Sequence, residues 1–272
     1  QPLVADARAG LLALDGALGR WKAGPTWSAR AGVLGRRWQR VVDQVTAAPK
    51  AGLPTDAQVL GAVNRVAGGN SVMVCAAGGL PGELHKLWRA ADAASYHVEY
   101  GYSCMGYEIA GGLGAKLAAP QREVYVLVGD GSYLMMNSEI ATSVALGLKL
   151  IVVLLDNRGF GCINRLQKDS GAAAFNNLLD DAAPQVDFAG HAASLGAHAA
   201  TVGTIAELEA ALAQARRRKS TSVIVIDTDP QHSTAEGGAW WDVPVSAAPR
   251  TSAARRARDA YEKNRKRQRL GA

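Results

Sequence analysis

Four continuous apolar runs constrain this chain more than any other feature of its sequence. They are SVMVCAA (71–77), EVYVLVGD (123–130), KLIVVLLDN (149–157) and TSVIVIDTD (221–229). Strands buried on both faces read as continuous apolar runs, whereas strands with one wet face alternate apolar and polar residues. Because stretches of helical periodicity separate the runs, the sequence predicts an α/β fold, a doubly wound, mostly parallel sheet flanked by helices.

Helical periodicity fills the intervals around these runs. The predicted helices cover Gly106–Leu117, Ser138–Leu146, Val186–Leu195 and Ile205–Arg218. Thr204 stands where the last of them needs an N-cap, and two amphipathic helices are predicted within residues 4–21 and 34–45. Ligands of such sheets bind beyond the carboxyl ends of the strands, so the residues that follow each run are the candidates for function.

A linker divides the early part of the chain. Pro49 and Pro54 lie in the stretch AAPKAGLPTD, which precedes a helix that Thr55 or Asp56 would cap. We predict residues 1–50 as the end of a preceding domain with linker helices, 51–230 as the α/β domain, and 231–272 as an extension with a basic tail. Because the chain opens in helical material, we expect it to be the C-terminal part of a longer protein.

The net charge of +6 is concentrated near the C-terminus. Between Arg250 and Arg269 there are nine Lys and Arg residues against Asp259 and Glu262, a net of +7, which leaves 21 basic and 22 acidic residues elsewhere. A nucleic-acid-binding protein is expected to spread basic and aromatic residues over a folded face. The pattern therefore predicts a solvated terminal helix and argues against nucleic acid as the partner.

Cysteine usage and hydropathy narrow the setting. Cys75, Cys104 and Cys162 are odd in number and widely spaced, which favours a reducing compartment, the cytoplasm. The sequence has no run of about 18 apolar residues, so we predict no membrane span.

A glycine-rich turn follows the second apolar run. Gly129, Asp130, Gly131 and Ser132 lead toward a helix that Asn137 and Ser138 open, and such a turn offers backbone N–H groups to a phosphate. The spacing fails the dinucleotide fingerprint, because Leu134 occupies the position of its third glycine. The carboxylate of this turn would also repel a bound diphosphate, because both are negatively charged, unless a cation lies between them.

The third apolar run supplies the partners that such a cation needs. Asn157 lies 27 positions after Asp130, and a strand-helix-strand unit of that length returns the chain beside its starting strand. A carboxylate, an amide oxygen, a backbone carbonyl and phosphate oxygens are the hard ligands that Mg²⁺ takes.

The run GDGSYLMMNSEIATSVALGLKLIVVLLDN resembles the metal motif of the thiamine-diphosphate-dependent enzymes, with Asp156 in place of the first Asn of its usual ending. The resemblance implies that Asp130, Asn157 and the carbonyl of Gly159 hold Mg²⁺ against the diphosphate of thiamine diphosphate. It also implies that Gly131 and Ser132 donate hydrogen bonds to the diphosphate oxygens.

Two further segments extend the resemblance. The stretch GYSCMGYEIAGGLGAKLA is similar to the segment of acetolactate-synthase-like members that supports the bent cofactor. By that similarity Met105 props the cofactor, its N–H meets a pyrimidine nitrogen, and the Ser103 carbonyl accepts from the amino group. In CAAGGLPGELHKLW, Gly78 and Gly79 are the candidates for diphosphate contact, although a plain turn would explain them too.

The amino-acid sequences of several segments are most similar to one branch of the family. SCMGYEIAGGLGAKLA, GDGSYLMMNSEIATS, DNRGFGCINRLQ and GGAWWDVPV resemble the branch that cleaves a carbon–carbon bond of a cyclic 1,2-dione by hydrolysis in inositol catabolism. The resemblance implies a homo-oligomer and an activating glutamate in a missing N-terminal domain. No catalytic residue is therefore assigned in this chain. The alternatives are another acetolactate-synthase-like enzyme or a Rossmann NAD-dependent oxidoreductase.

Other polar residues give weaker signals. The five histidines, His85, His97, His191, His198 and His232, are interpreted as surface or packing residues, with His232 best placed because it follows the last strand. Arg158 and Arg165 are equally compatible with a diphosphate or substrate contact and with solvated loops. Cys104 has no neighbouring group that would mark a reactive thiol, so it is assigned no role.

Overall fold

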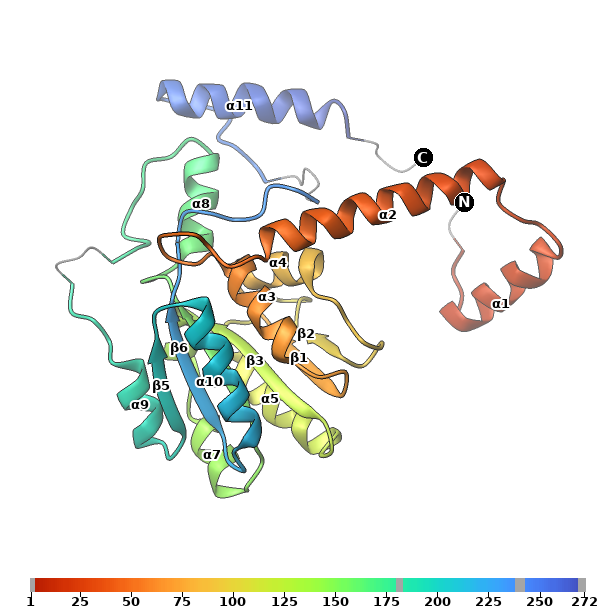
Figure 1. Ribbon diagram of the computed structural model, residues 1–272. Coiled ribbons are helices and arrows are strands. Elements are labelled where there is room, and N and C mark those ends of the chain that lie inside the picture. The colour runs from red at the N-terminus through yellow and green to blue at the C-terminus, as the bar shows by residue number, and fades with distance from the viewer. Residues whose placement is uncertain (1–2, 180–182, 238–242, 269–272) are drawn as a thin grey trace. The chain divides into compact units, whose positions relative to one another are not determined.

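The computed structural model describes residues 3–179, 183–237 and 243–268 (Figure 1). Within them, six parallel strands form one sheet in the order β2-β1-β3-β4-β6-β5. The strands are β1 (Ser71–Cys75), β2 (Tyr96–Val98), β3 (Glu123–Gly129), β4 (Ile151–Asp156), β5 (His198–Val202) and β6 (Ser222–Asp227). The predicted parallel α/β sheet is confirmed. Residues 238–242, which include part of the GGAWWDVPV string, lie outside the described residues.

The four apolar runs are the four central strands, and their residues are buried almost throughout. The edge strands β2 and β5 were not predicted. No residue of either strand is buried, so neither needs a continuous apolar run. Their sequences therefore lack the signal that identified the other strands.

Helices flank the sheet on both faces (Figure 1). Together with the two N-terminal helices described below, the structure contains α3 (Asp56–Val66), α4 (Leu80–Leu87), α5 (Tyr107–Ala118), α6 (Asp130–Met135), α7 (Glu139–Ala145), α8 (Gly161–Asp169), α9 (Phe188–Ser194), α10 (Ile205–Arg217) and α11 (Ser252–Arg265). The four helices predicted between the strands are present as α5, α7, α9 and α10. One prediction needs correction, because a short helix, α6, begins at Asp130, directly where β3 ends, whereas the sequence indicated a turn up to Asn137.

Side-chain caps fix two of the helix starts that the sequence indicated. Thr204 accepts a hydrogen bond from the N–H of Glu207, as predicted for α10. Of the two candidates for α3, Thr55 is the N-cap, and it forms a capping box with Gln58. Asp56 is thereby the first residue of α3.

The core lies between the sheet and its two layers of helices. On one face, side chains of α5, α7 and α9 (Ile109, Ile140 and Phe188) join strand residues such as Val126 in one buried cluster. On the other, α3 packs against α4 and α10, and α10 packs on β4, β5 and β6. Each fully buried aliphatic side chain stabilises the fold by roughly 1.5–3 kcal/mol.

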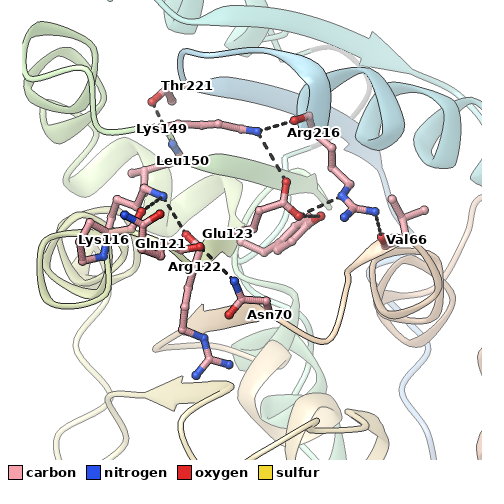
Figure 2. A network of polar contacts seen from close by, with 12 residues as sticks. Val66, Asn70, Lys116, Gln121, Arg122, Glu123, Lys149, Leu150, Arg216 and Thr221 are labelled. Carbon is pink, nitrogen blue, oxygen red and sulfur yellow. Dashed lines mark hydrogen bonds and ion pairs between the residues drawn. The ribbon is translucent and has the colours of Figure 1, made fainter.

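A polar network covers the amino ends of the central strands (Figure 2). Glu123, the first residue of β3, accepts from Arg216 Nε at 2.9 Å and lies 3.6 Å from Lys149 Nζ. The Asn70 side chain donates to the carbonyl of Gln121 at 3.0 Å. Charges at this edge of the sheet are thus paired within the chain.

The chain divides into two compact units, Gln1–Val42 and Asp43–Ala272. The first contains α1 (Ala7–Leu18), which Asp6 caps, and most of α2 (Pro25–Val45). The second contains the sheet and ends in α11, whose residues are all at least partly exposed, so the predicted solvated terminal helix is confirmed. Among the described residues, no helix is both long enough and apolar enough to cross a membrane.

Candidate functional site

A cavity of about 420 Å³ opens at the carboxyl ends of β1, β3 and β4. Its walls include every residue predicted for the site: Gly78, Gly79, Ser103, Met105, Asp130, Gly131, Ser132, Asn157 and Gly159. These residues come from four segments of sequence, and the parallel sheet brings them together at one edge.

The predicted metal ligands come from neighbouring strands. Asp130 follows β3 and Asn157 follows β4, and the two strands pair up to Gly129 and Leu155. Asp130 Oδ2 accepts from the N–H of Gly159 at 2.6 Å. Asp130 Oδ1 and Asn157 Oδ1 are buried and have no hydrogen-bond partner among the described residues. Buried oxygens are normally paired, so this pair fits a hard cation such as Mg²⁺.

The electrostatics of Asp130 agree with that fit. The residue is 5% exposed. Burial, reinforced by the neighbouring Asp156 carboxylate, raises the pKa of Asp130 to about 7. A carboxylate held in this position needs a compensating positive charge to remain ionised. Among the described residues no cluster of three His, Cys, Asp or Glu side chains exists, so a metal here would need amide and carbonyl oxygens as well.

The loop after β4 is held in one conformation. Arg158 has φ +59 and donates its N–H to Asp156 Oδ1 at 2.8 Å. Gly159 has φ +138, and a Cβ there would lie 2.5 Å from the carbonyl oxygen of Asn177. That oxygen accepts from the N–H of Phe160 at 2.7 Å. The position of Gly159 therefore requires glycine, and the residue lines the cavity.

The turn at the start of α6 is equally crowded. A Cβ on Gly131 would lie 2.7 Å from the Phe160 ring and 3.6 Å from Met105 Cε. The Ser132 hydroxyl donates to Glu108 Oε1 at 2.9 Å and accepts from the N–H of Gly106 at 3.0 Å. Its proton is already used, so the predicted donation to a diphosphate rests on backbone N–H groups.

A carboxylate holds the loop that contains Ser103 and Met105. Ser103 has φ +52, a conformation that non-glycine residues seldom adopt. Glu99 stabilises it by accepting from the N–H of Tyr102 at 3.0 Å and from that of Cys104 at 2.7 Å, one on each side of Ser103. These two hydrogen bonds lower the pKa of Glu99, so the carboxylate that holds this loop is charged.

Two cavity residues gave little sign of themselves in the sequence. Asp56, identified only as a helix start, is 6% exposed, and its Oδ1 has no partner in the described part of the chain. Burial raises the pKa of Asp56 to about 6, against the opposing effect of Arg165. Arg165 passes so close to Gly79 that a Cβ there would lie 2.5 Å from its Nη2. No local pattern joins these residues, which lie far apart in sequence.

Of the weaker candidates, Arg165 lines the cavity, whereas the five histidines, Arg158 and Cys104 do not. The His232 ring is 74% exposed and pairs with Asp229, and His191 shares a hydrogen bond with the Tyr133 hydroxyl. Cys104 is exposed, and partial desolvation together with the nearby Glu99 raises the pKa of its thiol. Cys104 therefore has no sign of an activated nucleophile.

A family model described as "Thiamine pyrophosphate enzyme, C-terminal TPP binding domain" matches residues 76–226, more than half of the chain. The chain belongs to this family of thiamine pyrophosphate enzymes, and the matched part contains every cavity residue except Asp56. The prediction made from the metal motif is thus confirmed at the level of the family.

Curated relatives are more specific in name. The chain is 44% identical over 202 residues to a 3D-(3,5/4)-trihydroxycyclohexane-1,2-dione hydrolase of Geobacillus thermodenitrificans, covering 71% of this chain and 32% of the relative. It is 40% identical over 228 residues to the protein of the same name from Bacillus subtilis, covering 83% and 36%. The chain thus spans about one third of the length of these relatives.

Solved structures agree on the fold. A thiamine diphosphate-dependent 4-hydroxybenzoylformate decarboxylase of Rhodococcus jostii superposes with a TM-score of 0.62 over 67% of this chain and 34% of its own, at 21% identity. At that identity the likeness concerns the fold alone.

Proposed function

We propose that this chain is the diphosphate- and magnesium-binding part of an enzyme that hydrolyses a carbon–carbon bond of a cyclic 1,2-dione. The proposed substrate is trihydroxycyclohexane-1,2-dione and the product 5-deoxy-glucuronate, in inositol degradation. The names of relatives at 40–45% identity support this choice. The observation that carries the proposal is the pair of unpartnered, buried oxygens of Asp130 and Asn157 at the cavity wall, stated for the described residues.

The proposed metal centre uses three groups of this chain. Asp130 Oδ1 and Asn157 Oδ1 would bind Mg²⁺, together with the carbonyl of Gly159 and oxygens of the diphosphate. The Gly159 N–H on Asp130 Oδ2 orients the carboxylate so that its other oxygen stays available. The positive charge of the ion would keep Asp130 ionised despite its burial.

The remaining predicted residues would hold and orient the organic part of thiamine diphosphate. When bound, that cofactor supplies an electron sink that no amino-acid side chain offers. Gly131, Ser132, Gly78 and Gly79 would present backbone groups to its diphosphate. Met105 would shape its bent form by packing, and the Ser103 carbonyl would accept from its amino group.

The chain itself supplies no catalytic acid or base in this proposal. The activating glutamate is expected in an N-terminal domain, and the residue ranges 1–50, 51–230 and 231–272 remain the proposed domain organisation. We further propose a homo-oligomer and, because Cys75, Cys104 and Cys162 are free thiols, a cytoplasmic location. No role for a nucleic acid or a membrane is proposed.

Two alternatives differ in how the chain supports them. Another acetolactate-synthase-like enzyme would use the same metal and cofactor residues on a different substrate. An NAD-dependent oxidoreductase is disfavoured, because Asp130 would repel the dinucleotide's pyrophosphate and Leu134 replaces the third glycine.

The decisive experiment uses the full-length protein that contains this chain. With thiamine diphosphate and Mg²⁺ it should convert the dione to an open-chain acid, monitored by chromatography, and the 272-residue chain alone should not. Consumption of pyruvate with no reaction of the dione would instead establish the acetolactate-synthase-like alternative. Turnover of the dione by the chain alone would contradict the missing glutamate.

A further inference from the structure

A second buried carboxylate, Glu108, lies behind the cavity and belongs to none of the predicted contacts. It is in the first turn of α5 and is 1% exposed. It is absent from the cavity wall, so it can reach a bound cofactor only through other residues. Family resemblance assigned no role to it.

Both carboxylate oxygens of Glu108 are satisfied, by donors from three segments. Oε1 accepts from the Ser132 hydroxyl at 2.9 Å and from the N–H of Ala77 at 3.2 Å. Oε2 accepts from the N–H of Gly106 at 3.0 Å, and this N–H also lies 3.0 Å from Ser132 Oγ. One side chain therefore joins the ends of β1, α5 and β3.

Each of these donors adjoins a residue of the proposed cofactor site. Ala77 precedes Gly78 and Gly79, Gly106 follows Met105, and Ser132 lies in the turn that begins with Asp130. Gly106 has φ +93 and a Cβ there would lie 2.9 Å from Met136 Cβ, so this position requires glycine. The segments are thus fixed relative to one another through the carboxylate.

Burial makes this arrangement sensitive to the charge of the side chain. A buried carboxylate is tolerated when several N–H and O–H groups donate to it, and removal of the acceptor leaves those donors unsatisfied. Burial raises the pKa of Glu108, whereas the hydrogen bonds from Ser132, Ala77 and Gly106 act in the opposite direction.

We propose that Glu108 is a positioning residue, which holds the Ala77, Gly106 and Ser132 segments in the arrangement that receives thiamine diphosphate. This inference rests on the proposed function of the cavity. The arrangement is complete without a ligand, so Glu108 would organise the site before the cofactor binds, which reduces the cost of ordering it on binding.

The test substitutes Glu108→Gln in the full-length protein and measures the affinity for thiamine diphosphate in Mg²⁺ by calorimetry. Gln keeps the shape and one oxygen but turns an N–H₂ group toward donors, so we expect affinity to fall by about tenfold. Turnover of the dione at saturating cofactor should return to near the wild-type value. Ser132→Ala should act on the same network, so the double variant should lose little more than either single variant.

Glu83→Gln is the matched control. Glu83 is a 3% exposed carboxylate of α4, accepts from the N–H of Thr234 at 2.9 Å and does not line the cavity. Its substitution should lower the melting temperature and leave cofactor affinity within about twofold. If Glu108→Gln behaves like Glu83→Gln, the proposal for Glu108 is wrong. If the wild-type protein itself binds no thiamine diphosphate, the proposed function fails, and the inference fails with it.

Discussion

The two ends of the central strands differ in how their polar side chains are partnered. At the amino edge, Glu123 is paired with both Arg216 and Lys149 (Figure 2). At the carboxyl edge, Asp130 Oδ1 and Asn157 Oδ1 are buried with no partner in the part of the chain that the structure describes. Glu123 begins β3 and Asp130 directly follows it, so the two cases lie at opposite ends of one strand.

Polar groups at the amino ends of the strands bind partners within the chain, whereas those at the carboxyl ends are available to a ligand. Ion pairs such as those of Glu123 close the sheet within the chain and contribute modestly to stability. Unpaired buried oxygens are costly, and the two of Asp130 and Asn157 lie together at a cavity wall, where a bound ion could satisfy both. The carboxyl edge is thus the incomplete one, in agreement with the family to which the chain belongs.

Asp130→Ala should produce the largest effect. Removal of the carboxylate deletes the proposed anionic ligand of Mg²⁺, so metal-dependent binding of thiamine diphosphate should be lost, by about 100-fold or more in affinity. Glu123→Ala, the same kind of change at the amino edge, should leave affinity within about twofold. Calorimetric titration measures both, and equal affinities for the two variants would remove the distinction between the edges.

Conservative variants should change the stability of the metal-free protein in opposite directions. Burial raises the pKa of Asp130 to about 7, so at pH 8 the folded state carries an unfavourable charge. Asp130→Asn should therefore increase the free energy of unfolding by about 2–4 kcal/mol. Glu123→Gln should decrease it by about 1 kcal/mol. Urea denaturation in EDTA gives both values, and a loss of stability in Asp130→Asn would contradict the account.

Asp56 offers a pH-dependent version of the same comparison. Burial raises its pKa to about 6, so the folded state retains a proton that the unfolded state releases near pH 4. The contribution of Asp56 to stability should be largest below about pH 4, fall by about 1–3 kcal/mol as the pH rises to 6, and then level off. Asp56→Asn should lack this decline. The difference between the two urea-denaturation pH profiles measures it, and parallel profiles would show that Asp56 titrates normally.

Removal of the residues after Pro249 should have the smallest effect. This segment carries the excess of positive charge and includes α11, in which no residue is fully buried. It contributes none of the cavity residues, so affinity for thiamine diphosphate should change by less than about twofold. The same calorimetric titration applies, repeated at two salt concentrations. A large loss would bring the tail into the site.

Much of the fold and cavity could be predicted because the signals are local. The continuous runs identified the four central strands, since a strand buried on both faces leaves no other composition open. The turn from Gly129 to Ser132 and the loop from Asn157 to Gly159 each contain their candidate ligands within a few consecutive residues. Parallel topology then predicts that the two segments meet at one edge, and the structure places both in one cavity wall.

The remaining features depend on contacts between distant segments. The edge strands β2 and β5 are half exposed and lack the apolar run of a central strand. Asp56 was identified as a helix start, and only the packing of α3 brings it to the cavity. Glu108 occupies a helical position in an apolar stretch, and its three donors come from residues 77, 106 and 132. No periodicity or spacing in the sequence indicates that these distant residues come together.

We propose that the residues after β3 and β4 bind thiamine diphosphate through a metal ion. The most direct measurement is the thermal unfolding of the protein with thiamine diphosphate, with Mg²⁺, with both, and with NAD. At 100 times the dissociation constant a ligand stabilises a protein by roughly 2.7 kcal/mol. We expect stabilisation of this size when thiamine diphosphate and Mg²⁺ are present together, and little stabilisation with either one alone. Stabilisation by NAD, or by thiamine diphosphate to the same extent in EDTA, would contradict it.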